Sequence, residues 1–238
     1  MAFLAIAVLL RVERAQADIP ISIELVLAVD TSLSVDDIEY DLQMTGIANA
    51  FRNPEILDLI AQQGSVAVTL FQWSDEVDQR NTVPWHLLSG PATVMSFADK
   101  VEILERNPSR TYTGIGRAID FAVRLIAENN FAGRQLTIDI SGDGRDNIGT
   151  LPSAARQRAA SMGIAINGLP ILIDTYNLDA YYRDKVIVGP GAFLEIATDY
   201  NDFARAFLRK LRREIAPSIS RADPRPARHA HAKPRHIH

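Results

Sequence analysis

The chain has 238 residues, of which 47% are hydrophobic and 23% charged, a composition typical of a globular protein of one α/β domain or two small ones. It contains no cysteine, which excludes disulfides, thiolate metal sites and cysteine nucleophiles. The net charge is −4, but residues 1–17 contribute +1 and residues 218–238 contribute +4, so the body between them carries −9. Such an acidic body argues against a nucleic-acid partner and is compatible with a bound cation.

Residues 1–17 match a signal peptide. Residues 2–10 are a continuous apolar run, shorter than the about 20 residues that a membrane span needs, and "AQA" at 15–17 fits cleavage after Ala17. Two features are atypical, because no basic residue precedes the run and "RVER" separates it from the cleavage site. We expect a periplasmic or secreted bacterial protein with no membrane span in the mature chain; the alternative is an N-terminal extension.

The next stretch predicts two buried strands with helices between them. The runs "SIELVLAV" (22–29) and "GSVAVTLFQWS" (64–74) are almost continuously apolar, as in strands covered on both faces. A helix is expected after Ser34, its candidate N-cap, and before Pro54, followed by a short helix over "EILDLIAQ". The apolar stripe of the first helix consists of Ile38, Leu42, Ile47, Ala48 and Phe51.

The remaining elements continue the alternation. Residues 76–90, with a turn-rich centre and Pro84, fit a strand at the sheet edge. Further strands are expected at 134–144, 164–172 and 191–197, and further helices at 92–106, 113–129, 153–163, 178–187 and 199–216. The pattern predicts the α/β class: a doubly wound, largely parallel sheet with helices on both faces and one antiparallel edge strand, as one domain over residues 18–216.

Residues 217–238 are expected to be a disordered basic tail. They hold four proline and four of the five histidine residues and almost no apolar side chains. The histidines at 229, 231, 236 and 238 could bind a soft metal, but a solvated tail is the simpler reading.

Oxygen-bearing side chains gather at the ends of two predicted strands. The first strand ends in Asp30, Ser32 and Ser34, and the strand at 134–144 ends in "SGDGRDN", with Asp143, Asp146 and Asn147. The hydroxyl-rich loop "SRTYTGIG" (109–116) opens a helix between them. In a doubly wound sheet these three loops converge at the carboxyl ends of the strands. The alternative is that Asp30, Ser32 and Ser34 only cap a helix, and we assign Asp146 and Asn147 to a turn.

A donor set made only of oxygen atoms selects a hard cation, Mg²⁺ first, with Mn²⁺ or Ca²⁺ as alternatives. If neutral hydroxyls make the direct bonds, the ion keeps most of its positive charge. It then favours an anionic oxygen from outside, such as the Asp or Glu of a partner protein.

The D-x-S-x-S pattern after the first strand, here Asp30, Ser32 and Ser34, resembles the metal-ion-dependent adhesion site of von Willebrand factor A domains. The family's threonine lies five residues before a helix glycine, which matches Thr111 and Gly116, with Thr113 as the reserve. The family's second acid corresponds to Asp143. The resemblance covers roughly residues 22–214 and implies that Asp30 anchors the ion through water, Ser32 and Ser34 bind it directly, Thr111 joins on partner engagement and Asp143 orients a bound water.

A closer resemblance is to an uncharacterised bacterial family of von Willebrand A-like domains whose members look exported. It is carried by "LVLAVDTSLSVDDIEYDLQ", "ISGDGRDN" and "VIVGPGAFLEIATDY". One departure from the adhesion site is Ser141-Gly142 before the acid, where adhesion domains have a threonine directly.

The expected function is an exported, non-enzymatic module that docks a partner carboxylate on a bound divalent ion. One alternative is a metal-assisted phosphoester hydrolase, but no acid lies two residues after Asp30, no phosphate-binding loop is present, and the body's only histidine, His86, is expected on the edge strand. The other alternative is a cytoplasmic partner of an ATPase, which an uncleaved N-terminus would favour.

Overall fold

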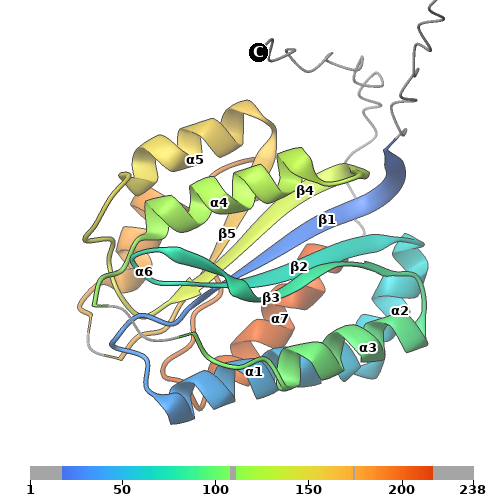
Figure 1. Cartoon of the computed structure of the whole chain (residues 1–238), viewed down its shortest axis with the longest axis horizontal. Coiled ribbons are helices and arrows are strands. Elements are labelled where there is room, and N and C mark those ends of the chain that lie inside the picture. Colours follow the sequence, from blue (N-terminus) through green and yellow to red (C-terminus); the bar gives the residue numbers. More distant parts are fainter. Residues whose placement is uncertain (1–17, 108–110, 174, 217–238) are drawn as a thin grey trace, which may run out of the picture.

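The computed structural model describes residues 18–107, 111–173 and 175–216 (Figure 1). Its centre is a five-stranded sheet in the order β3-β2-β1-β4-β5. The strands are β1 (Ile19–Asp30), β2 (Val66–Trp73), β3 (Val77–Leu88), β4 (Phe131–Gly142) and β5 (Ile164–Pro170). All neighbouring pairs are parallel except β2 and β3, so the sheet is largely parallel with one antiparallel edge strand, as predicted. The signal peptide and tail predicted for residues 1–17 and 217–238 lie outside the described residues.

Helices cover both faces of the sheet (Figure 1). One face carries α1 (Asp37–Arg52), α2 (Pro54–Gln63), α3 (Pro91–Glu102) and α7 (Phe203–Ile215). The other carries α4 (Ile115–Glu128), α5 (Pro152–Ser161) and the short α6 (Leu178–Tyr181), which continues into a π-helical turn, η1 (Tyr182–Val186). This is the doubly wound α/β architecture that the alternation of strands and helices predicts.

The central strand β1 explains the long apolar run in the sequence. Leu25 and Leu27 belong to the core beneath α1 and α7, whereas Val26 and Ala28 belong to the core beneath α4 and α5. Successive side chains of a strand point to opposite faces, so a strand covered on both sides needs apolar residues at nearly every position.

Three element predictions need correction. Asp36, not Ser34, caps α1. Its carboxylate accepts a hydrogen bond from the Glu39 N–H, and the Glu39 carboxylate accepts one from the Asp36 N–H. Ile38, expected in the buried stripe of α1, is 71% exposed. Residues 191–197 do not form a strand: Leu194 and Ala197 make only isolated bridges along the outer edge of β5.

A buried charged cluster attaches α7 to the sheet. Lys210 Nζ lies 2.6 Å from Asp139 Oδ1 on β4 and 2.7 Å from Glu214 Oε1 one turn along α7. Asn167 on β5 donates to the same Glu214 oxygen at 2.8 Å. Burial raises the pKa of Asp139 to about 7, although Lys210 opposes this shift.

Candidate metal centre

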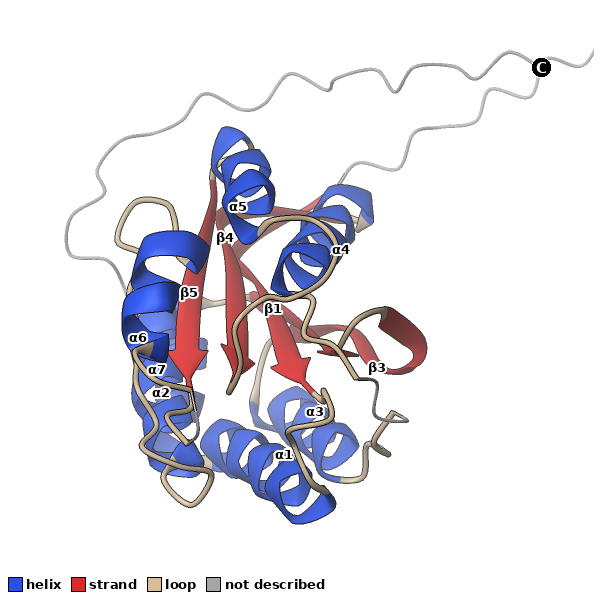
Figure 2. Cartoon of the chain, turned by 90° about the vertical axis from the view of Figure 1, so that its left-hand side faces the viewer, coloured by secondary structure: helices blue, strands red, loops and turns tan. Residues whose placement is uncertain are grey.

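The predicted site residues come from loops at one edge of the sheet. The strands β1, β4 and β5 end at the same side of the molecule (Figure 2). Ser34 Oγ, in the loop after β1, donates to Asp143 Oδ1, in the loop after β4, at 2.7 Å. Ser32 Oγ lies 3.2 Å from Ser34 Oγ. The structure therefore brings Asp30, Ser32, Ser34 and Asp143 together across 109 positions of sequence.

Asp30 is the most deeply buried acid of this group. Its Oδ1 accepts from the Ser32 N–H at 2.8 Å, and its Oδ2 is buried with no hydrogen-bond partner. Burial and the negative charge of Asp143 raise the pKa of Asp30 to about 8. A cation between the two carboxylates would favour their charged forms, so the donor set fits a divalent ion.

Thr111 and Thr113 both lie in the loop before α4, and Thr113 is packed beside the loop that carries Asp143. Thr113 is 6% exposed, and a Cβ at Gly144, next to Asp143, would lie 3.3 Å from its Oγ1. Thr111 is exposed. The chain enters α4, which starts at Ile115, through Thr113 and Gly114, so Thr111 remains the predicted ligand and Thr113 the reserve.

Asp146 and Asn147 connect the loop after β4 to the loop before α4 and to the first turn of that helix. Asn147 Oδ1 accepts from the Thr113 N–H at 2.8 Å, and the Asn147 N–H donates to the Thr113 carbonyl at 2.9 Å. Asp146 Oδ1 accepts from the Gly116 N–H at 3.1 Å in the first turn of α4, whose own N-cap residue, Gly114, has no side chain to do so. These residues position Thr113 and the start of α4, a structural role between two loops instead of the local turn that the sequence predicted.

Two tyrosines that the sequence reading did not assign lie near these carboxylates, and Tyr200 alone hydrogen-bonds to one of them. Tyr200 donates to Asp143 Oδ2 at 3.1 Å. Tyr182 is fully buried, and a Cβ at Gly142 would lie 2.9 Å from its hydroxyl and 2.7 Å from Asp30 Oδ2. This crowding explains the glycine where adhesion domains have a threonine. No local pattern marks either tyrosine, since Tyr200 is 57 residues from Asp143.

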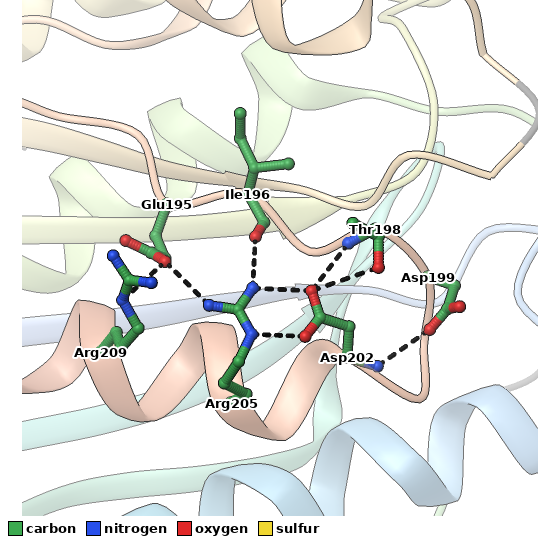
Figure 3. A network of polar contacts seen from close by, with 7 residues as sticks. All are labelled: Glu195, Ile196, Thr198, Asp199, Asp202, Arg205 and Arg209. Atoms are coloured by element: carbon green, nitrogen blue, oxygen red, sulfur yellow. Dashed lines mark hydrogen bonds and ion pairs between the residues drawn. The ribbon is translucent and has the colours of Figure 1, made fainter.

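The loop that carries Tyr200 is braced against α7 (Figure 3). Asp202 accepts from the Thr198 N–H at 3.0 Å and forms an ion pair with Arg205, whose guanidinium also donates to the Ile196 carbonyl at 3.1 Å. Glu195 pairs with Arg209 at 3.2 Å. Tyr200 is therefore presented to Asp143 from a fixed loop.

Hydroxyls dominate the possible ligand set. Within the described parts of the chain, no three His, Asp or Glu side chains are grouped so that they could hold a metal ion. An ion at this centre would therefore depend on Ser32, Ser34 and a threonine of the loop before α4 in addition to the two carboxylates. His86 lies on the edge strand β3, where its Nδ1 is 2.6 Å from the Pro84 carbonyl oxygen, and it is not part of the centre.

The sheet order and the two helical layers are those of the von Willebrand A-type fold. Solved structures agree on the fold. Proximal thread matrix protein 1 from the mussel byssus matches with a TM-score of 0.59 at 14% identity over 83% of this chain and 48% of that chain. A further structure of it, with a zinc-occupied MIDAS motif, matches with a TM-score of 0.54 at 13% identity over 82% and 48%.

Two bacterial structures show the same fold. The pilus adhesin SpaC from Lactobacillus rhamnosus GG matches with a TM-score of 0.60 at 14% identity over 82% of this chain and 30% of that chain. A von Willebrand factor type A protein from Catenulispora acidiphila matches with a TM-score of 0.54 at 14% identity over 82% and 43%. The chain spans less than half the length of each of these proteins.

The chain belongs to the family described as "Protein of unknown function (DUF1194)", whose model matches residues 20–219. No curated protein matches the sequence. Across residues 18–107, 111–173 and 175–216, none of the helices has the length and apolar character needed to cross a membrane.

Proposed function

We propose that this protein is a non-enzymatic binding module that holds a divalent ion, Mg²⁺ first, and docks the carboxylate of a partner protein on it. The observation that carries the proposal is the contact of Ser34 with Asp143, which joins two loops next to the unpartnered oxygen of Asp30. A cluster of buried acid and neutral hydroxyls suits a hard cation, and the hydroxyls leave much of its charge unneutralised.

Each residue has a distinct role in this proposal. Asp30 anchors the ion from the interior, and Ser32 and Ser34 supply neutral oxygen atoms. Asp143 orients a coordinating water, with its own second oxygen held by Tyr200. Thr111, with Thr113 as the reserve, contributes its hydroxyl when a partner engages; Thr111 is exposed and so accessible to a partner.

Two of the similar proteins support an adhesion-type role with a bound metal ion. One of them is described as a pilus adhesin and another has a zinc-occupied MIDAS motif. By this analogy we propose that the present chain also acts outside the cytoplasm, in the periplasm or after secretion, and that the ion site serves binding and not hydrolysis.

Isothermal titration calorimetry with MgCl₂ or MnCl₂ tests the ion site. We expect one site in the wild type, loss of its heat in Asp30→Asn, and no change in Asp120→Asn. Asp120 is a matched control because its carboxylate pairs with Arg158, which links α4 to α5. Circular dichroism establishes that both variants fold. Equal heats in Asp30→Asn and the wild type, or no heat in the wild type, would overturn the proposal.

A further inference from the structure

Each of three loops around the candidate metal centre presents a large apolar side chain to solvent. Leu33 lies between Ser32 and Ser34 and is 63% exposed. Tyr112 directly precedes Thr113 and is 48% exposed. Tyr176, in the loop after β5, is 84% exposed. Most large apolar side chains of this molecule are buried, so the exposure of these three beside candidate ligands points to a contact surface.

The distribution of exposed apolar side chains over the described residues supports this reading. Ten large apolar residues are exposed, and six of them lie in the loops after β1, β4 and β5, just before α4, or in the first turn of α1. These six are Leu33, Ile38, Tyr112, Leu151, Ile173 and Tyr176. All of these segments lie at the edge of the sheet where the candidate ligands gather.

An exposed arginine lies at the same edge of the sheet. Arg145, two residues after Asp143, is exposed, and its guanidinium donates to the Tyr176 carbonyl at 2.6 Å and lies 5.5 Å from the centre of the Tyr181 ring. Within the described part of the chain, no carboxylate pairs with it. Arg145 thus joins the loop after β4 to the loop after β5 and leaves a positive charge beside the metal centre.

We propose that these loops form a docking surface for an extended segment of a partner protein in which one Asp or Glu is flanked by large apolar side chains. This rests on the proposed function: the acid binds the ion, and the inference adds what surrounds it. Leu33, Tyr112 and Tyr176 pack against the apolar flanks, and Arg145 attracts the acidic segment. The chain's own segment 218–238 carries +4 and does not match this charge requirement.

Selection from a random peptide library tests the surface without assuming a partner. The full chain is immobilised in MgCl₂, panned with phage-displayed 12-residue random peptides, and eluted with EDTA. We expect enriched peptides to contain an Asp or Glu with a large apolar residue within two positions. Enriched peptides that lack the acid or its apolar flanks, or no enrichment at all, would overturn the inference.

Variants then map the surface with the enriched peptide as the probe. We expect Tyr176→Ser and Arg145→Gln each to weaken its binding about 10-fold by fluorescence anisotropy, and Met95→Ser to leave it unchanged. Met95 is the control because it is 39% exposed on α3, away from the candidate ligands. Unchanged binding in both variants would overturn the inference.

Calorimetry, sedimentation and vesicle binding distinguish the alternatives. If the wild type gives a metal-binding heat but selects peptides without apolar flanks, the inference fails and the proposed function stands; if it gives no heat, the proposed function itself fails. Reversible dimers in sedimentation that Tyr176→Ser abolishes would assign the surface to a second copy of this chain. Binding to phosphatidylglycerol vesicles that Tyr176→Ser abolishes would assign it to a lipid surface. Either result would overturn the partner-segment inference.

Discussion

Replacing Lys210 with methionine tests how α7 is attached to the sheet. Lys210 is fully buried between Asp139 and Glu214, and one oxygen of each acid already has no hydrogen-bond partner. Removing the cation leaves two buried carboxylates facing one another, and loss of one partner from a buried ion pair typically costs about 3–5 kcal/mol. We expect Lys210→Met to lower the free energy of unfolding by about 3–5 kcal/mol.

Urea denaturation followed by circular dichroism measures this loss. The control is Arg212→Met, because Arg212 pairs with Glu55 at 2.8 Å with both side chains about half exposed. Surface pairs of this kind contribute about 0–1 kcal/mol. A loss below about 1 kcal/mol in Lys210→Met, or equal losses in the two variants, would refute the reasoning from buried charge. Replacing Lys210, Asp139 and Glu214 together with apolar residues should recover most of the loss, since no buried charge is then left unpaired.

Three further results are expected. In chelator, the urea midpoint should fall as pH rises from about 4 to about 8. Burial raises the pKa of Asp139 to about 7 and of Asp30 to about 8, so the folded protein binds more protons than the unfolded chain in this range. Asp139→Asn should weaken this pH dependence of the midpoint. A midpoint that rises with pH would contradict the reasoning. Gly116→Ala should destabilise the fold by about 1–3 kcal/mol or more in the same assay, since its Cβ would lie 1.7 Å from the Thr150 carbonyl oxygen; wild-type stability would mean that this loop moves freely. Asp36→Ala should cost about 1 kcal/mol through loss of the α1 capping box, and an unchanged midpoint would reassign the cap.

Much of this fold is predictable from the sequence because its signals are local. The apolar run at 22–29 reads as a strand buried on both faces, and Pro54 and Pro91 stand at helix starts. The predicted cap at Ser34 was wrong because Asp36 caps α1 instead. The Ser34 hydroxyl donates to Asp143, a residue more than a hundred positions away. Sequence spacing does not show whether a serine hydroxyl will bond to a helix terminus or to a residue of another loop.

The meeting of the candidate ligands was predictable to the level of loops, although their metal binding stays a prediction. Asp30, Ser32, Ser34 and Asp143 follow from strand ends in a parallel sheet. The choice between Thr111 and Thr113 depends on where α4 begins, which Asp146 and Asn147 fix from another loop. Tyr182 and Tyr200 carry no local signal, because an aromatic residue near a helix start is equally consistent with core packing.

The irregular path of residues 188–197 along β5 has a consequence for how these molecules meet one another. Val188 bridges β5 antiparallel, Leu194 bridges it parallel, and Ala197 bridges Ile171 just after it; Gly189 and Gly191 turn the chain between Val188 and Leu194. The opposite border of the sheet, β3, contains Pro84 and two interruptions in its register with β2. Within the described residues both borders are interrupted, which disfavours intermolecular strand addition, the usual start of aggregation for β-sheets, at either side.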